Sequence, residues 1–385
     1  MNASRHTLHK LLHKFTRSEL SSDDVASLRL ALNETQAKDW QALLSQAELY
    51  GISNWLLKHC TEQGLAVPKS VLLSLKALSM RHRAAANARY QLMQALIEKL
   101  AEHNVPLVAL KGLALAPMIY PSDELRPMRD LDVLVPRDKE ALAAKLIREM
   151  GFHLPESQPS RFMRNSHQLP NATKSVNGFN ISLEIHHDAL SRDVHGNLFY
   201  EDLLPTLQTV KWRDIEFKTL GHEQMLHQVC RHLQALHPGA VLKLINVMDV
   251  VLYCEQYDDE IDWLCLIKEY SHVINTLKCL HSIMPLSEKL QQRIAWPKKG
   301  DHSDGKVIGR MSGIGETMVS PKNIISSQNS RPEQLKLLFS PSDWWLHLYY
   351  NVDPRNTLFL VKTVRHPTTI LVWLAQRLYS RLLGG

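Results

Sequence analysis

Residues 126–135 read RPMRDLDVLV, and this stretch decides the fold of the region around it. Its apolar residues alternate with Asp130 and Asp132, a period of two residues that predicts a half-buried β-strand. Because residues i and i+2 of a strand point to the same face, both carboxylates project from one side, about 7 Å apart along the chain. Two like charges on one face are costly unless a cation lies between them, so the stretch predicts a cation site.

A second strand offers a further carboxylate for that site. Hard divalent cations such as Mg²⁺ bind carboxylate oxygens and leave room for substrate phosphates, and two-metal chemistry usually needs a third carboxylate from another strand. Glu184 lies on the polar face of the alternating stretch ISLEIHH, which follows the turn NGFN at 177–180. The alternatives are an edge-strand surface glutamate and, for the aspartate pair, a solvated strand entrance.

The residues around these strands predict a small mixed α/β unit over 89–220. PLVAL at 106–110 is typical of a short strand, which ends at Lys111 and Gly112, and LALAPMIY follows as a short helix. After DLDVLV, Asp138 is expected to cap a further helix. The strands and helices alternate closely enough to share one core.

The two flanks of this unit predict helical modules. Residues 1–88 contain the capping cluster SSDD at 21–24 and show helical apolar spacing, without evident chemistry. Residues 221–385 contain two apolar helical stretches, EQMLHQVCRHLQAL and VLKLINVMDVVLYC. Within them, 298–330 is poor in large apolar residues and rich in Gly and Ser, which predicts a mobile loop. A chain of 385 residues agrees with such a division.

The stretch LVALKGLALAPMIYPSDELRPMRDLDVLVP resembles the uncharacterised bacterial nucleotidyltransferase family of the polymerase β-like superfamily. The resemblance covers about 90–250 and extends weakly into both flanks. It implies an α+β fold in which a small mixed-sheet nucleotidyltransferase core is flanked by N- and C-terminal helical modules. It also implies a Mg²⁺ cofactor, with Mn²⁺ as a substitute, and transfer of a nucleoside monophosphate from an NTP to a hydroxyl acceptor.

The resemblance also implies roles for particular residues. Asp130, Asp132 and Glu184 would be the catalytic metal ligands, and Gly112 would lie in the turn beside the triphosphate. The superfamily commonly has Gly-Ser or Gly-Gly at this turn, whereas here leucine follows the glycine. A phosphate-binding hydroxyl is therefore missing, and Lys111 would supply charge instead. This departure supports the alternative that the chain is an inactive nucleotide-binding or scaffold protein that kept the fold.

Further residues are candidates for substrate binding. Arg126 and Arg129 flank the aspartates and would bind phosphate, with simple charge balance as an equal alternative. His186 shares the face of Glu184, where it would contact substrate or orient a carboxylate; a surface histidine is the alternative. Phosphate hydrolysis through Glu184, His186 and His187 lacks the wider set of ligands that such sites need.

The two apolar helical stretches of the C-terminal flank contain two further candidates for substrate binding and one carboxylate that needs a partner. His227 and Arg231 share a face of a predicted helix, where an interhelical pair is the favoured interpretation and contact with substrate in the cleft is the alternative. Asp249 lies in the apolar helix NVMDVVLY and needs a partner, either a structural one such as Lys243 or Arg231, or a group in the cleft.

Composition limits the partners and the compartment. The net charge of +6 weakly favours an anionic partner, but no aromatic and basic stripe indicates nucleic acid, and the acceptor stays unknown. Five cysteines without a CxxC pair, an N-terminus unlike a secretory signal and the lack of a long apolar run predict a cytoplasmic protein. The end, TTILVWLAQRLYSRLLGG, predicts a closing core helix, with peripheral membrane contact as the less favoured alternative.

Overall fold

The structure is a computed structural model, and it describes residues 11–156, 167–190, 198–234, 243–281, 283–295, 339–340, 343–350, 352 and 356–383. The loop predicted at 298–330 lies outside the described residues.

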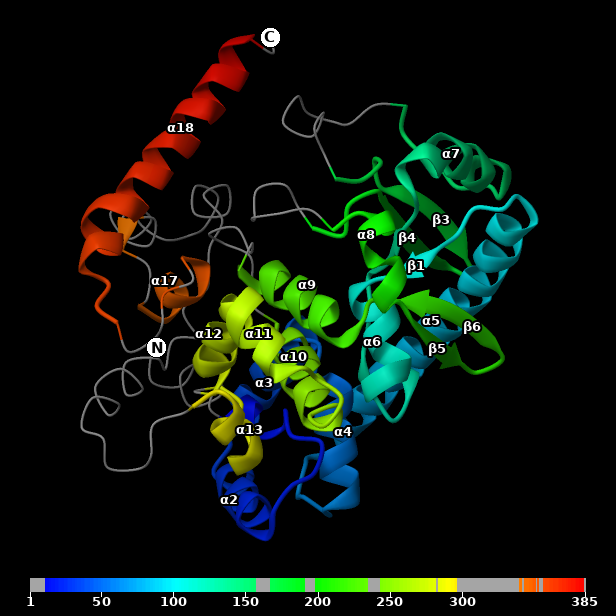
Figure 1. The fold of residues 1–385 in the computed structure, drawn as a ribbon. Helices are drawn as coiled ribbons and strands as arrows, with labels where there is room; N and C mark the ends of the chain where they lie inside the picture. Colours follow the sequence, from blue (N-terminus) through cyan, green and yellow to red (C-terminus); the bar gives the residue numbers. More distant parts are fainter. Residues whose placement is uncertain are drawn as a thin grey trace.

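A six-stranded mixed sheet carries the carboxylates of the two alternating stretches (Figure 1). In spatial order its strands are β3 (Ala172–Val176), β4 (Phe179–His186), β2 (Asp130–Leu134), β1 (Val108–Ala109), β6 (Ile215–Thr219) and β5 (Gln208–Trp212). Strands β2 and β4 run parallel to each other, whereas β1 runs antiparallel to β2 and parallel to β6. With helices on both sides of it in sequence, this sheet confirms the predicted α+β class.

The register of β4 is fixed by its hairpin with β3. Asn177 and Gly178 connect the two strands, and both have a positive φ, 50° and 80°. A two-residue turn of this kind matches the twist of its strands, and Asn-Gly is its preferred sequence. The turn therefore fixes which residues of β4 face the core, because a slip of one residue would turn every side chain to the other face.

The apolar faces of β2 and β4 lie in the core. Each of four side chains on them has at most 1 % of its surface exposed: Leu131, Val133, Leu183 and Ile185. Burial of a side chain of this size contributes about 1.5–3 kcal/mol, so the register with these four inside is strongly favoured. The residues between them, including Asp132 and Glu184, consequently lie on the opposite, polar face.

Helices make up most of the other described residues. They are α2 (Ser22–Asn33), α3 (Ala37–Leu49), α4 (Ser53–Glu62), α5 (Lys69–Glu102), α6 (Lys111–Ile119), α7 (Glu140–Glu149), α8 (Tyr200–Leu203), α9 (His222–Gln234), α10 (Leu244–Gln256), α11 (Trp263–Glu269), α12 (Ser271–Leu280), α13 (Glu288–Arg293), α17 (Asp343–Tyr349) and α18 (His366–Leu383). The predicted cap of α2 is present as a capping box between Ser21 and Asp24.

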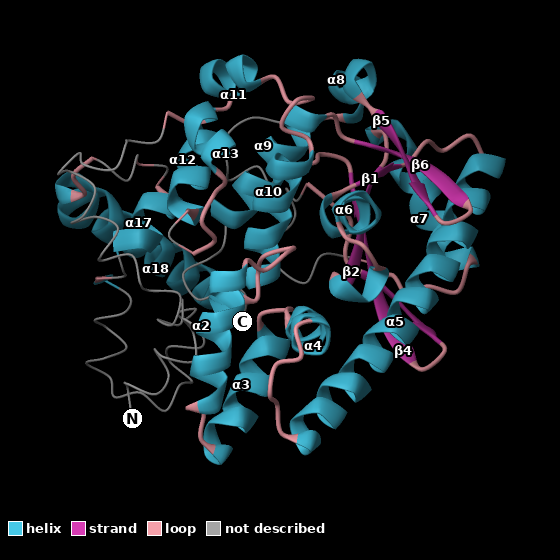
Figure 2. Ribbon diagram, turned by 90° about the horizontal axis from the view of Figure 1, so that it is seen from below, coloured by secondary structure: helices cyan, strands magenta, loops and turns pink. Residues whose placement is uncertain are grey.

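Figures 1 and 2 show the N-terminal helices α2–α4 beside α9–α13, with the sheet on the other side of the molecule. The contact is direct, since the Ile245 N–H at the start of α10 donates to the Tyr50 carbonyl at 3.1 Å. Gly51 has a φ of +75°, and a Cβ added there would lie 2.8 Å from Ile245. The two helical flanks, far apart in sequence, therefore pack against each other at Gly51. Any residue with a side chain would collide with Ile245 at this position.

Some local predictions differ from the structure. Helix α5 continues through residue 88, so the structure has no break at the predicted boundary between the first two units, and the division into three units stays a prediction. Asp138 does not cap α7, because a 3₁₀ turn, η2 (Arg137–Lys139), precedes that helix. Strand β1 has two residues, fewer than the five of PLVAL.

The C-terminal helix α18 extends away from the body (Figure 1). Ile370 and His366 on it are buried, whereas Leu371 and Val372 expose half or more of their surface. No helix among the described residues is long and apolar enough to cross a membrane.

Candidate active site

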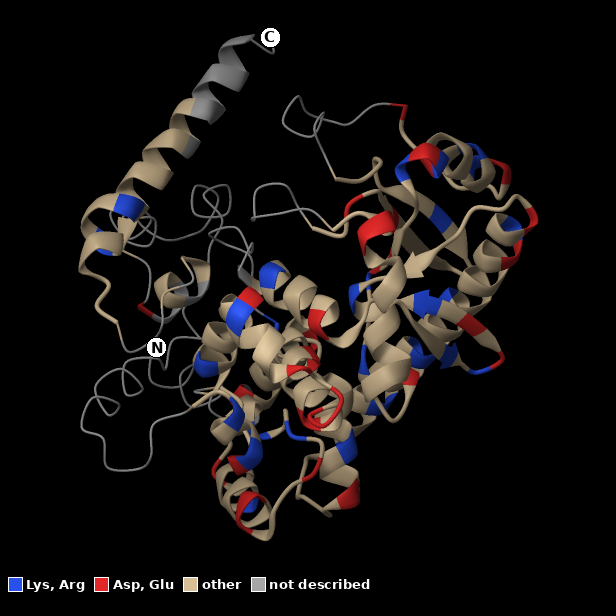
Figure 3. Cartoon of the chain, in the orientation of Figure 1, with Lys and Arg blue, Asp and Glu red and all other residues tan. Residues whose placement is uncertain are grey.

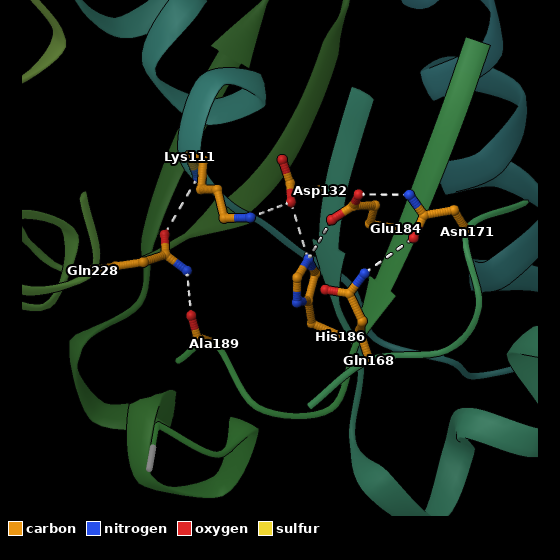
Figure 4. A network of polar contacts seen from close by, with 8 residues as sticks. All are labelled: Lys111, Asp132, Gln168, Asn171, Glu184, His186, Ala189 and Gln228. Atoms are coloured by element: carbon orange, nitrogen blue, oxygen red, sulfur yellow. Dashed lines mark hydrogen bonds and ion pairs between the residues drawn. The ribbon is translucent and has the colours of Figure 1, made fainter. Parts of the chain in front are cut away.

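Parallel pairing of β2 and β4 places two carboxylates opposite each other. Asp132 is the register partner of Glu184, and Asp130 is the partner of Ser182. Because the side chains of register partners lie on the same face, Asp132 and Glu184 are neighbours although 52 positions separate them in sequence. His186 follows two residues after Glu184 and shares the face (Figure 4).

The side chains of Asp132, Glu184 and His186 form a compact cluster. The His186 Nε2 atom lies 3.0 Å from Asp132 Oδ1 and 3.7 Å from Glu184 Oε2. One ligand atom from each residue lies within 4.8 Å of the others, and this geometry could hold one metal ion. Two carboxylates and an imidazole are a donor set that suits Mn²⁺ and also accepts Mg²⁺ through its oxygens.

A polar chain from the β3 side orients Glu184. The Asn171 side-chain amide donates to Glu184 Oε1 at 2.8 Å, and the Gln168 amide donates to Asn171 Oδ1 at 3.1 Å (Figure 4). One Glu184 oxygen is thereby held by the amide, while the other points to His186. Such supporting hydrogen bonds fix the rotamer of a ligand and so its position relative to its neighbours.

Charges within the cluster shift the pKa values of its members in opposite directions. Burial would raise the pKa of Asp132, but Lys111 and His186 hold it well below its usual range. Burial and the nearby Asp132 charge raise the pKa of Glu184 to about 7. Burial lowers the pKa of His186, against the effect of its contact with Asp132, so its imidazole is neutral near pH 7. Asp132 is thus the ionised carboxylate on which the cluster is centred.

Lys111 is the cation that faces Asp132. Its Nζ atom lies 2.5 Å from Asp132 Oδ1, and the pair raises the pKa of Lys111 although burial opposes this. The Lys111 backbone has a φ of +47°, in the left-handed region that residues with a side chain seldom adopt. Its N–H donates to Gln228 Oε1 of α9 at 3.3 Å. A strained backbone held in place at the turn from β1 to α6 is a feature often found at functional sites.

Arg126 has a different partner from the one that the sequence indicated. Its guanidinium forms two hydrogen bonds with Asp249 of α10, at 3.1 and 2.6 Å, and Tyr120 donates a third to the same carboxylate at 2.7 Å. Asp249 is therefore paired with Arg126 and Tyr120, and the expected partners Lys243 and Arg231 were wrong. Arg126 lines the cavity of the site, and its guanidinium already forms a bidentate pair with Asp249.

This buried pair also explains Gly112. Its φ is not in the positive range, so conformational freedom is not the reason for glycine. A Cβ atom at position 112 would collide with the Arg126 guanidinium, which Asp249 and Tyr120 hold in place. Only a glycine at the start of α6 allows Arg126 to lie so close to that helix.

A cavity of about 140 Å³ opens beside the cluster. It lies between the start of α6, the segment before β2, α9 and the start of α10. Its charged and polar lining residues are Lys111, Arg126, Arg129, Asp130, Asp132, His232, Lys243, Asn246 and Asp249. Asp130 lines this cavity, but among the described residues it does not belong to the compact group of Asp132, Glu184 and His186. Of the three expected carboxylates, Asp132 and Glu184 therefore form a compact group with His186. Asp130 lies two residues earlier on β2 and lines the cavity.

The structure places His227 and Arg231 outside the lining of this cavity. The His227 Nδ1 atom lies 2.9 Å from His272 Nε2 of α12, and the His227 ring packs on Tyr270. For His227 this is the interhelical pair that the sequence favoured. Helix α9 instead presents Val229, His232 and Leu233 to the cavity.

The buried His227 should make stability depend on pH. Burial, with a smaller effect of Arg231, lowers the pKa of His227 to about 4, against about 6.5 in an unfolded chain. The unfolded state therefore binds the proton first, and stability present above pH 6.5 is lost as the pH falls towards 4. Urea unfolding of His227→Gln between pH 7 and pH 4.5 should give a free energy that falls less steeply, by up to about 1.4 kcal/mol per pH unit. An unchanged slope would contradict this, and His103→Gln, at an exposed position, is the control.

Sequence reasoning missed several residues of the site. Asn171 and Gln168 come from a loop without a pattern. Arg89 of α5, which interacts electrostatically with Asp130, lies on a long helix among other basic residues. Gln228 was detectable in principle, because it is next to His227 on a helix that was predicted. The sequence does not give the rotation of that helix relative to the sheet, so it does not show which face of the helix points to the site.

The site is thus a cluster of carboxylates and a histidine on the polar face of a mixed sheet, beside a cavity with several cations in its lining, an arrangement that could hold a metal ion and phosphate groups. The chain belongs to the family described as uncharacterised nucleotidyltransferase, whose model matches residues 36–291, more than half of the chain. It is thus a transferase of the nucleotidyltransferase class. No curated protein matches the sequence.

One solved structure is similar in part. It is the solution structure of the antibiotic-resistance factor ANT(2″)-Ia, with 13% sequence identity and a TM-score of 0.32. The similarity covers 45% of this chain and 86% of that chain.

Proposed function

We propose that the protein transfers a nucleoside monophosphate from an NTP to a hydroxyl group of an acceptor, in a reaction that depends on Mg²⁺ or Mn²⁺. The acceptor oxygen forms a bond to the α-phosphorus, and the bond from that phosphorus to the bridging oxygen breaks. Pyrophosphate leaves, and the proton of the hydroxyl passes to solvent or a nearby base. Family membership supports the reaction class, and the site supports the residues.

The register of Asp132 with Glu184 is the observation that carries this proposal. It brings an ionised carboxylate and a second carboxylate together on the polar face, at the edge of a cavity that holds Lys111 and Arg129. Asp132 and Glu184 would hold the metal, with His186 either as a third ligand or as the group that orients Asp132. Asp130, two residues before Asp132 on the same face, would complete the carboxylate set once phosphates enter.

The metal, when bound, would lower the pKa of the attacking hydroxyl and neutralise charge on the phosphates. The chain's own residues have the other tasks. Lys111, the first residue of α6, would exchange Asp132 for a phosphate oxygen, in agreement with the charge that the sequence analysis assigned to it at this turn. Asn171 would keep Glu184 aligned, and Arg126 would keep the start of α6 in place through its bonds to Asp249.

The experiment that tests the function uses each of the four NTPs labelled on the α-phosphate, with Mg²⁺ or Mn²⁺ and a fractionated cell extract as a source of acceptors. We expect label in an acceptor and an equal amount of pyrophosphate, with Asp132→Asn as the background. Nucleotide binding without pyrophosphate above that background, with any extract, would favour the inactive nucleotide-binding alternative. The Lys111–Asp132 ion pair supports this inactive alternative, because it already neutralises one carboxylate of the cluster.

Glu184→Gln tests the role of the second carboxylate. The substitution keeps the size of the side chain and an oxygen for Asn171, but it removes the charge that the metal would need. We expect transfer to slow by roughly a hundredfold or more, with NTP affinity changed by less than about threefold. The reason is that Asp130 and Asp132 would keep the metal beside the phosphates, whereas Glu184 would help the metal activate the attacking oxygen, which matters mainly in the transition state. Single-turnover rates and equilibrium binding separate the two. A loss of binding equal to the loss of rate would contradict this role.

A further inference from the structure

A buried glutamine connects the two chain segments that flank Asp132. Figure 3 shows Lys and Arg interspersed with Asp and Glu over the described elements, so the overall charge pattern does not mark a binding face. In the interior, by contrast, Gln228 of α9 is neutral and has 1 % of its surface exposed. Both ends of its amide form hydrogen bonds (Figure 4): Oε1 accepts from the Lys111 N–H at 3.3 Å, and Nε2 donates to the Ala189 carbonyl at 2.8 Å.

The hydrogen bond to Lys111 supplies a partner that α6 lacks at its start. Lys111 is the first residue of this helix, and the first N–H groups of a helix have no acceptor within it. Leu110, at the N-cap position, offers no side-chain acceptor either. Gln228 therefore caps the helix from 117 positions further along the chain. It also holds Lys111 at a φ of +47°, which residues with a side chain seldom adopt.

The hydrogen bond to Ala189 holds the segment that follows β4. Ala189 comes three residues after His186, the last residue of that strand. Lys111 Nζ and His186 Nε2 both contact Asp132 Oδ1, at 2.5 and 3.0 Å. The contacts of the amide and of the carboxylate consequently close a ring through five residues, which Figure 4 shows: Gln228, Lys111, Asp132, His186 and Ala189.

We propose that Gln228 is a positioning residue of the active site, which holds the Lys111 backbone and the segment after β4 at a fixed separation. The inference rests on the proposed nucleotidyl transfer, in which the Lys111 ammonium leaves Asp132 for a phosphate oxygen. With its backbone held, this exchange needs only rotation of the Lys111 side chain. A backbone free to relax would carry the ammonium out of place, and a displacement of about 1 Å in an active site can cost about a hundredfold in rate.

The first test measures the contact directly, by amide hydrogen exchange of the full chain without substrate. Gln228→Met keeps the length of the side chain and removes both hydrogen bonds. We expect exchange of the Lys111 amide to be roughly tenfold faster, as for one lost hydrogen bond, while the amides in the middle of α5 keep their protection. Gln228→Asn keeps a polar group at this buried position but is too short to reach both partners. It should act in the same direction, and it serves as the test if Gln228→Met does not fold.

Two controls separate positioning of Lys111 from a general loss of stability. Gln41→Met makes the same chemical change at an exposed position on α3. His227→Gln changes the neighbouring residue on α9 and loosens the other side of that helix, where His227 lies 2.9 Å from His272 of α12. Neither variant should change the exchange of the Lys111 amide.

The second test determines whether Gln228 acts through Lys111. Calorimetry with Mn²⁺ measures binding of the α,β-methylene analogues of the four NTPs, which permit no transfer because a carbon bridge replaces the oxygen of the bond that would break. Gln228→Met should weaken binding of the preferred analogue about tenfold in the wild-type background, but less than about twofold in Lys111→Met, because changes that act through one residue are not additive.

Unchanged exchange of the Lys111 amide in both Gln228 variants would overturn the proposal. So would faster exchange over the whole chain in both, α5 included, because that result shows a general structural role. Equal losses of affinity in the two backgrounds would show that the amide does not act through Lys111, and would overturn it as well. Wild-type protein that binds none of the analogues would contradict the proposed function instead, and the exchange measurement would still decide whether Gln228 holds Lys111.

Discussion

Asp132→Asn should abolish nucleotidyl transfer, with a fall in kcat of about a thousandfold or more. Asp132 is the carboxylate that stays ionised in the cluster, and it is buried, with 4 % of its surface exposed. Asparagine keeps its shape but cannot neutralise a divalent cation, so metal-dependent binding of NTP should be lost as well. Calorimetry with and without Mn²⁺, and pyrophosphate release, measure the two effects.

A matched control for this variant is Asp138→Asn, which removes one charge from an exposed position just after β2. Rates and metal-linked affinity should be unchanged there. Asp130→Asn, alone and combined with Asp132→Asn, tests how far the first aspartate shares the metal. If Asp132→Asn folds normally and keeps metal-enhanced NTP binding, the cluster of Asp132, Glu184 and His186 is not the metal site.

Arg126→Met should destabilise the protein by about 3–5 kcal/mol, the cost of leaving a buried charge without its partner. Arg126 and Asp249 are both buried, and their pair joins the segment before β2 to α10 of the C-terminal helices. The Asp249 carboxylate would keep only the hydrogen bond from Tyr120. Denaturant unfolding at pH 7 measures the loss as a lower midpoint.

Arg126→Met combined with Asp249→Asn should recover more than half of this loss. The second change removes the buried charge and keeps an oxygen that accepts from Tyr120. Binding of NTP to the recovered protein then decides between two roles of Arg126. Unchanged affinity supports a structural pair, whereas a loss of about tenfold or more shows a phosphate contact, as the sequence suggested. A single variant as stable as wild type would show that the pair contributes little.

The sheet and the face on which the carboxylates lie were predictable from local sequence. Alternation in DLDVLV and ISLEIHH assigns each residue of β2 and β4 to the core or to the polar side, because a strand has a period of two. Asn177 and Gly178 then fix the turn, since few other residues adopt a positive φ at two successive positions. These rules depend on neighbours in sequence, so one chain is enough to apply them.

The partners of the charged side chains were not predictable in this way. Arg126 and Asp249 are 123 positions apart, and so are decided by how α10 packs against the segment before β2. Local rules offered Lys243 and Arg231 for Asp249, because both are close in sequence or on a neighbouring helix. Gly112 was interpreted as part of a phosphate-binding turn, but its small size is required by the Arg126 side chain.

The sequence by itself determined the α+β fold, the strands of Asp132 and Glu184, and the family to which those motifs point. The tertiary structure decided that His186 joins these two carboxylates, that Asp130 faces the cavity and that Arg89 and Lys243 lie near it. The physical reason is the range of the forces involved. Periodic burial and turn geometry act over a few residues, whereas ion pairs and buried cations depend on distances that exist only after distant helices pack on the sheet.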